Sequence, residues 1–167
     1  MPRVLAAFLA LFVFAATTAH AADAPATQTF DIRQTVMKVP VEPGLTAADV
    51  KDSIMATAMN LNMKFVGSQP LSQELQSRGV ESGHLEIFQF CNPLDARKMV
   101  DHNIIFAAYM PCRIVLVEDK DGQLWLEMID LDFLIDNAEL PPEVKDIAVK
   151  VSDMLKKIVE AGRVGDF

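Results

Sequence analysis

A β-hairpin in the second half of the chain limits the possible folds more than any other feature of the sequence. Residues 112–117 read CRIVLV, and residues 123–129 read QLWLEMI, in which apolar side chains alternate between two faces. The segment between them, EDKDG, ends in an Asp-Gly dipeptide, which is favoured where the backbone needs a positive φ. Two such runs joined by a short turn predict adjacent antiparallel strands. The other elements must therefore fit an antiparallel sheet.

The other predicted elements add further strands and several helices. Strands are predicted at 30–41, with an irregularity near Gln34, at 62–68 and at 85–91, where residues 85, 87, 89 and 91 share one face. Helices are predicted at 46–60, at about 70–79, at 93–103 and at 141–162, and an acidic solvated loop at 130–139. This order predicts an α+β fold: a two-layer sandwich whose mostly antiparallel sheet, of about five strands, carries helices on one face.

Local signals set the expected helix boundaries. Thr46 is placed to cap the first helix, with Asp49 at its third position, and Asn92 is placed to cap another helix that begins with Pro93. Gly162 is predicted to end the last helix.

The first residues have the form of a secretory signal peptide. Arg3 precedes an uncharged apolar run from residue 4 to 16, which is shorter than the about 20 residues of a membrane-spanning helix. Ala19-His20-Ala21 supplies a cleavage pattern. We therefore expect a leader at 1–21, a flexible lead-in at 22–29, one domain at 30–162 and a short tail at 163–167. The mature protein would be periplasmic or secreted and no longer attached to a membrane.

The charge of the chain argues against nucleic acid as a partner. Lys and Arg number 15 against 23 Asp and Glu, a formal net charge of −8, and loss of Arg3 with the leader makes the chain more acidic. An acidic protein repels nucleic acid and anionic lipid at long range. The sequence also lacks the phosphate-binding and hydrolase motifs that carry a recognisable mechanism, so we predict no catalytic residue and no cofactor.

Several stretches resemble the domain-of-unknown-function family 302. They are Phe90-Cys91-Asn92-Pro93, the run from Met110 to Val117, and the turn at 118–122, and the resemblance spans about residues 30–162. It implies a fold like that of the TATA-binding protein, with the order β-α-β(4)-α. Many members of that family carry other residues where Cys91 and Cys112 stand.

Cys91 ends one predicted strand and Cys112 begins another. If the two strands are antiparallel neighbours, a disulfide is geometrically possible, and if they are parallel it is not. The family resemblance favours the first arrangement. The pair is then either a structural disulfide or two buried thiols, or it is a redox or sulfur-transfer pair in which the following helix lowers the pKa of Cys91.

A soft-metal site, for example for copper, is a further alternative. Thiolate, thioether and imidazole ligands suit Cu(I), and the weak candidates beside the cysteines are His84, His102, Met99 and Met110. Their spacing matches no established ligand motif.

The preferred prediction is a non-enzymatic binding or accessory domain. Its ligand would be a small apolar or thiol-containing molecule or a periplasmic protein partner, held near the two cysteines by Asn92, Arg113, Tyr109 and Trp125. A homodimer formed through a sheet or helix face is a third possibility.

Overall fold

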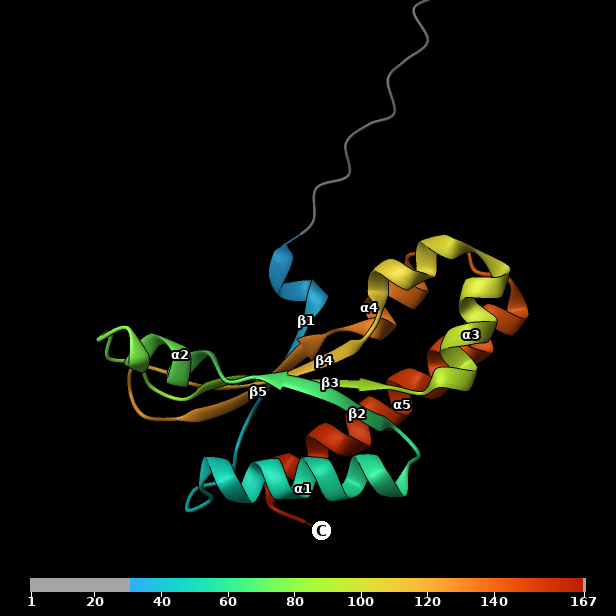
Figure 1. The fold of residues 1–167 in the computed structure, drawn as a ribbon. Coiled ribbons are helices and arrows are strands. Elements are labelled where there is room, and N and C mark those ends of the chain that lie inside the picture. Colours follow the sequence, from blue (N-terminus) through green and yellow to red (C-terminus); the bar gives the residue numbers. More distant parts are fainter. Residues whose placement is uncertain (1–30, 167) are drawn as a thin grey trace, which may run out of the picture.

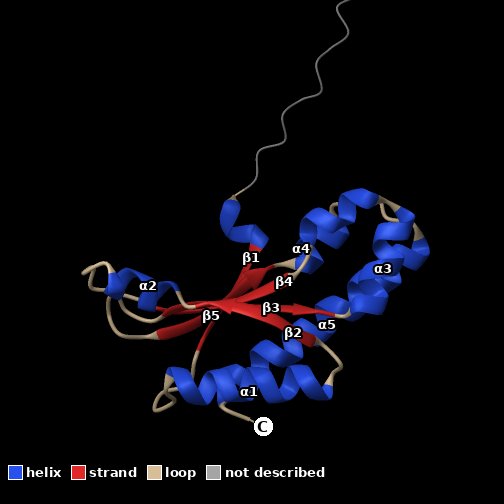
Figure 2. Ribbon diagram, viewed as in Figure 1, coloured by secondary structure: helices blue, strands red, loops and turns tan. Residues whose placement is uncertain are grey.

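An open sheet of five strands forms the centre of the molecule in the computed structural model, which describes residues 31–166 (Figures 1 and 2). The strand order is β1-β5-β4-β3-β2, and every neighbouring pair is antiparallel. The strands are β1 (Val36–Pro40), β2 (Lys64–Gln69), β3 (Leu85–Cys91), β4 (Cys112–Glu118) and β5 (Leu124–Ile129). The predicted α+β fold with an antiparallel sheet is confirmed.

The helices include two long ones that cover one face of this sheet. The helical segments are η1 (Ile32–Thr35), α1 (Ala47–Asn60), α2 (Leu71–Ser77), α3 (Pro93–His102), η2 (Ile104–Tyr109), α4 (Leu131–Asp136) and α5 (Pro142–Val164). Helices α1 and α5 pack side by side below the sheet in Figure 2, whereas α3, η2 and α4 gather beyond one end of the strands. The sheet therefore has one face in the core and one end enclosed by shorter helices.

The alternation of side chains along β3 shows how the core forms. Phe88 and Phe90 point to the helix face and are completely buried, whereas Ile87, Gln89 and Cys91, which alternate with them, are only partly buried. Ile114 and Leu116 of β4 lie beside them on the same face. This two-residue period is the one expected of a strand with a single fully buried face.

The predicted hairpin is present, and its turn is held by one side chain. Asp119 Oδ1 accepts hydrogen bonds from the backbone N–H groups of Asp121, at 2.9 Å, and Gln123, at 3.0 Å. Gly122 has φ of 83°, the positive value for which the Asp-Gly dipeptide is suited. The turn chemistry read from the sequence thus operates as predicted.

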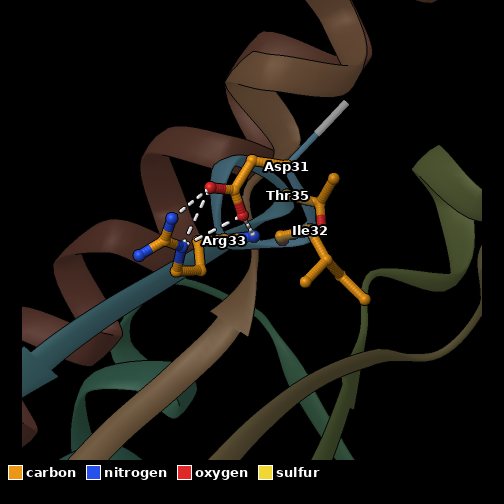
Figure 3. Close-up of polar contacts among 4 residues, drawn as sticks. All are labelled: Asp31, Ile32, Arg33 and Thr35. Carbon is orange, nitrogen blue, oxygen red and sulfur yellow. Dashed lines mark hydrogen bonds and ion pairs between the residues drawn. The ribbon is translucent and has the colours of Figure 1, made fainter. Parts of the chain in front are cut away.

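The entry into β1 is a single helical turn rather than a strand, which corrects the predicted strand at 30–41. Asp31 caps η1: its side chain accepts a hydrogen bond from the Arg33 backbone N–H at 2.9 Å and also pairs with the Arg33 guanidinium (Figure 3). Thr35 Oγ1 donates to the Ile32 carbonyl at 2.7 Å. These local bonds compete with extended backbone, which explains the irregularity expected near Gln34.

Two predicted boundaries in the last third of the chain are wrong. Within the acidic segment predicted as a loop, Leu131–Asp136 form the helix α4, because Asp130 accepts from the Phe133 N–H at 3.1 Å and caps it, while residues 137–139 are not helical. Helix α5 runs past Gly162 and ends at Gly165, which has φ of 74°. Gly165 is the residue with the left-handed conformation that ends many helices.

The predicted leader at 1–21 and lead-in at 22–29 lie outside the described residues. Within residues 31–166, no helix is long and apolar enough to cross a membrane. The implied likeness to the TATA-binding protein stays a prediction.

Candidate functional site

A cavity of about 850 Å³, which we call the main cavity, lies between one end of the sheet and the surrounding helical segments. Its volume falls within the range of about 300 to 1,000 Å³ that is usual for small-molecule sites. Most of its lining is apolar. The lining residues are Gln34, Thr35, Met63, Cys91, Asn92, Asp95, Ala96, Met99, Phe106, Tyr109, Met110, Cys112, Leu131, Phe133, Leu134, Ile135, Asn137, Ala138, Leu140, Ile147, Ala148 and Val151.

The sheet contributes both cysteines to the main cavity. Strands β3 and β4 are antiparallel neighbours in which Phe90 lies opposite Cys112, so Cys91 is the next residue beyond that pair. On its other side, Cys91 lies opposite Lys64, the first residue of β2. Met63 is the residue directly before Lys64. The ends of three neighbouring strands therefore bring sulfur-containing side chains to the cavity.

Helix α3 forms a second wall, and its start is fixed by a side-chain cap. Asn92 Oδ1 accepts from the backbone N–H groups of Leu94, at 3.1 Å, and Asp95, at 3.2 Å. The predicted cap is thus confirmed. Asp95 is buried and accepts from Lys150 Nζ of α5 at 2.7 Å, so a charge-assisted hydrogen bond ties α3 to α5 beside the cavity.

Helix α4 is tied to α5 in the same way on the remaining side. Asp132 Oδ1 accepts from the hydroxyl of Ser152, which is completely buried, at 2.7 Å, and Oδ2 pairs with Lys156. The hydrogen bond with Lys156 holds the pKa of Asp132 below its ordinary value. Helices α3 and α4 are therefore each tied to α5 by a charge-assisted contact, through Asp95 of the cavity lining and through Asp132 outside it.

Burial keeps both cysteines in the thiol form near neutral pH. It raises the pKa of Cys91, and it raises the pKa of Cys112 to about 11, with a smaller contribution from the neighbouring Cys91. The predicted lowering of the Cys91 pKa by the following helix is therefore not what the structure shows. Loss of solvation outweighs the helix dipole here.

The two cysteines are free and are not joined by a disulfide. The expected neighbourhood is present, because β3 and β4 are antiparallel. However, Cys112 pairs with Phe90 rather than with Cys91. Successive residues of a strand point to opposite faces, so Cys91 and Cys112 are not a directly opposed pair. A disulfide needs Cβ atoms about 4 Å apart, which this register does not favour.

Four more of the predicted site residues also line the main cavity: Asn92, Met99, Tyr109 and Met110. Arg113 and Trp125 do not. Arg113 is exposed on the face of β4 that points away from the core. Trp125 lies on the same outer face, where its Nε1 donates to Asp119 and Lys38 Nζ lies 4.3 Å from its ring centroid.

Neither of the two candidate histidines, His84 and His102, belongs to the cavity lining. His84 precedes β3, at the end of that strand opposite Cys91, and its backbone N–H donates to Glu118 Oε2 at 2.9 Å. His102 ends α3, where its ring centroid lies 6.4 Å from that of Phe106. Within residues 31–166, no three His, Cys, Asp or Glu side chains form a group that could hold a metal ion.

Sequence reasoning missed several residues of the cavity, among them Met63, Asp95 and Ala148. In the sequence, Asp95 is an acidic residue in the first turn of the helix that Asn92 caps, a position where such charges are common. Its burial depends on Lys150, which is 55 residues further along the chain. No local pattern could have revealed that contact.

Comparison with known proteins places the fold but not an activity. Residues 37–162 match the sequence model of the family described as domain of unknown function DUF302. A crystal structure of an uncharacterized conserved DUF302 protein from Bacillus stearothermophilus is similar, with a TM-score of 0.65 and 19% identity, covering 77% of this chain and 98% of that one. No curated protein matches the chain.

Proposed function

The chain belongs to the family described as domain of unknown function DUF302, so we propose a function from its own geometry: it binds a small, mainly apolar molecule in the main cavity. The observation that carries this proposal is the cavity itself. A cavity of about 850 Å³ with a mainly apolar lining has the volume and the surface of a small-molecule site.

The lining supports a mainly apolar ligand that also meets a few polar side chains, among them Gln34, Thr35 and Asn137. Asn92, Cys91 and Cys112 lie together at the sheet end of the cavity, and Tyr109 adds a hydroxyl. The wall from α5 consists of Ile147, Ala148 and Val151. Such a division, with an apolar body and a few polar groups, is usual for sites that bind small molecules.

The first test fills the cavity and measures binding of the apolar dye Nile red. Ala148 lines the cavity, so the larger side chain of Ala148→Phe should occupy part of it and weaken dye binding by at least about tenfold. Val149 is the next residue of α5 and is 41% exposed, so Val149→Phe is the matched control and should bind like the wild type. Equal dye affinities for wild type and a folded Ala148→Phe protein would contradict the proposal.

A second candidate function, thiol-dependent redox or sulfur transfer, draws support from the common location of Cys91 and Cys112 in this cavity. It requires a reactive thiolate, and burial works against that by raising the pKa of both groups. A persulfide mass shift on either cysteine after exposure to a sulfane sulfur donor would favour this candidate over simple binding.

The proposed setting for this activity is outside the cytoplasm, after removal of the leader. An intact mass of the exported protein that begins after Ala21 would support it, and a mass that still contains Met1 would contradict it. A protein partner or a homodimer also stays a proposal, for which native mass spectrometry gives the subunit number.

A further inference from the structure

We propose that the sheet end of the main cavity is a Cu(I) site, with Cys91 and Cys112 as thiolate ligands and Met99 and Met110 as thioether ligands. Five sulfur-containing side chains line this one cavity, namely Met63, Cys91, Met99, Met110 and Cys112. The proposal does not depend on the apolar ligand, because it rests on these side chains alone.

The topology explains why the sulfur atoms gather. Cys91 is the last residue of β3 and Cys112 is the first residue of β4, and these strands are antiparallel neighbours. Met110 lies two residues before Cys112, and Met99 comes from α3, which begins directly after Cys91 and Asn92. Residues from one strand end and its two flanking segments are thus brought to the same space.

The two cysteines are not bonded, yet both line the main cavity at the ends of adjacent strands. Cys91 contributes to the raised pKa of Cys112. A disulfide requires a sulfur separation of about 2 Å and a fixed dihedral angle. A metal ion held between two sulfur atoms allows a wider separation than that bond, and both side chains line the same cavity where their strands end.

The types of ligand select a soft monovalent ion. Thiolate and thioether groups suit Cu(I), whereas carboxylate, carbonyl and water ligands suit harder cations. Both histidines lie outside the cavity lining, and within residues 31–166 no three His, Cys, Asp or Glu side chains group for a metal. The site is therefore unsuited to Zn²⁺ or Ca²⁺.

Methionine often fills gaps in a core, and that role must be separated from metal binding. Met37, Met128 and Met154 belong to the hydrophobic core or pack against it, and Met63 is 2% exposed in the same core. Met99 and Met110 are only partly buried, lie outside that core cluster and face open volume in the cavity. They are consequently free to move toward an ion without loss of core packing.

Binding is a proton exchange without a redox step. Two thiols and one Cu⁺ give a bis-thiolate complex of charge −1 and release two protons. Arg113 follows Cys112 directly and favours its thiolate form. Because binding of Cu⁺ by two thiols releases protons, the apparent association constant should rise with pH.

The test is an anaerobic titration of the reduced protein with Cu(I), in competition with the chelator bathocuproine disulfonate. We expect one Cu(I) per chain. Cys91→Ser and Cys112→Ser should each weaken binding by more than the about 10- to 100-fold lost with an outer-shell partner. The Met99→Leu, Met110→Leu double variant should bind more weakly than wild type, whereas Met59→Leu, which alters an exposed methionine of α1, should not.

Two further measurements keep the result unambiguous. X-ray absorption at the copper edge should show sulfur neighbours only, and a nitrogen or oxygen shell would overturn the proposal, as would unchanged affinity in both cysteine variants. Circular dichroism and a cooperative thermal transition check that the cysteine variants are folded. Cysteine variants that lose Cu(I) binding and keep dye binding would support the copper site. A protein that binds Cu(I) and does not bind the dye would contradict only the proposed apolar ligand and not the copper site.

Discussion

His84 lies among charged side chains at the end of the sheet opposite the main cavity. Its Nε2 is buried, lies 3.9 Å from Glu86 Oε2 and has no hydrogen-bond partner among the described residues. Lys51 Nζ donates to the other carboxylate oxygen of Glu86, Oε1, at 2.9 Å. Glu86 and Glu118 raise the pKa of His84 and Lys51 lowers it, but burial is the largest effect, and the pKa falls below its ordinary value.

This environment predicts that the protonation of His84 makes the stability of the protein depend on pH. The pKa of His84 is lower in the folded than in the unfolded chain, so the unfolded chain binds more protons as the pH falls through about 6.5. The free energy of unfolding should therefore fall from pH 7.5 to 5.5, and the fall should be smaller in His84→Gln. Urea unfolding at both pH values measures it.

His102→Gln is the matched control, because His102 is an exposed residue at the end of α3. It should keep the pH dependence of the wild type. An identical pH dependence in His84→Gln and wild type would show that the buried position of His84 has no effect on stability.

At the scale of elements, the contact between α1 and α5 depends on a glycine. A Cβ atom at Gly162 would lie 2.8 Å from Ile54 Cγ1 of α1 and 3.1 Å from Leu126 Cδ1 of β5. Both neighbours are completely buried. Gly162 is therefore required for the close approach of two helices and a strand and does not end α5.

Gly162→Ala should destabilise the protein. Overpacking of a dense core costs about 1 to 3 kcal/mol, which exceeds the gain of about 1 kcal/mol in helix propensity. We expect a net loss of about 1 kcal/mol in the free energy of unfolding, measured by chemical denaturation. Gly67→Ala in β2, where a Cβ meets nothing within 4 Å, is the control and should change stability little. A more stable Gly162→Ala protein would show that Ile54 moves aside readily.

At the scale of the whole molecule, the sheet order and the helices at its end decide the state of the cysteines. Cys91 and Cys112 are separated by a helix and a 3-10 segment in sequence, and they meet because β3 and β4 pair. The same packing removes water from Cys112 and raises its pKa to about 11. The fold thus brings two thiols together and also suppresses their reactivity.

Alkylation of the protein as isolated, with no reductant added, measures both properties. Unfolded in denaturant without reductant, it should take up two iodoacetamide groups, because no disulfide joins the cysteines. In the folded protein at pH 8, Cys112 should react at least about 100-fold more slowly than in the unfolded chain, because a far smaller fraction is thiolate. Peptide mapping assigns the sites. A single uptake, or none, before reduction would reveal a disulfide instead.

The sequence by itself determined the local features of this protein. The hairpin, the Thr46 and Asn92 caps and the alternating faces of β3 are all present as predicted. Each depends on contacts between residues a few positions apart, namely turn hydrogen bonds, cap hydrogen bonds and a two-residue period. Such contacts leave a readable pattern in the chain.

Only the tertiary structure decided which of the candidate residues lie together. It groups Met63, Met99 and Met110 with the two cysteines around one cavity, and it leaves Arg113 and Trp125 outside the lining. The choice depends on strand order and register and on helices that meet through residues far apart in sequence. Burial follows from the same packing, so the direction of the cysteine pKa shifts could not be obtained from the helix that follows Cys91 alone.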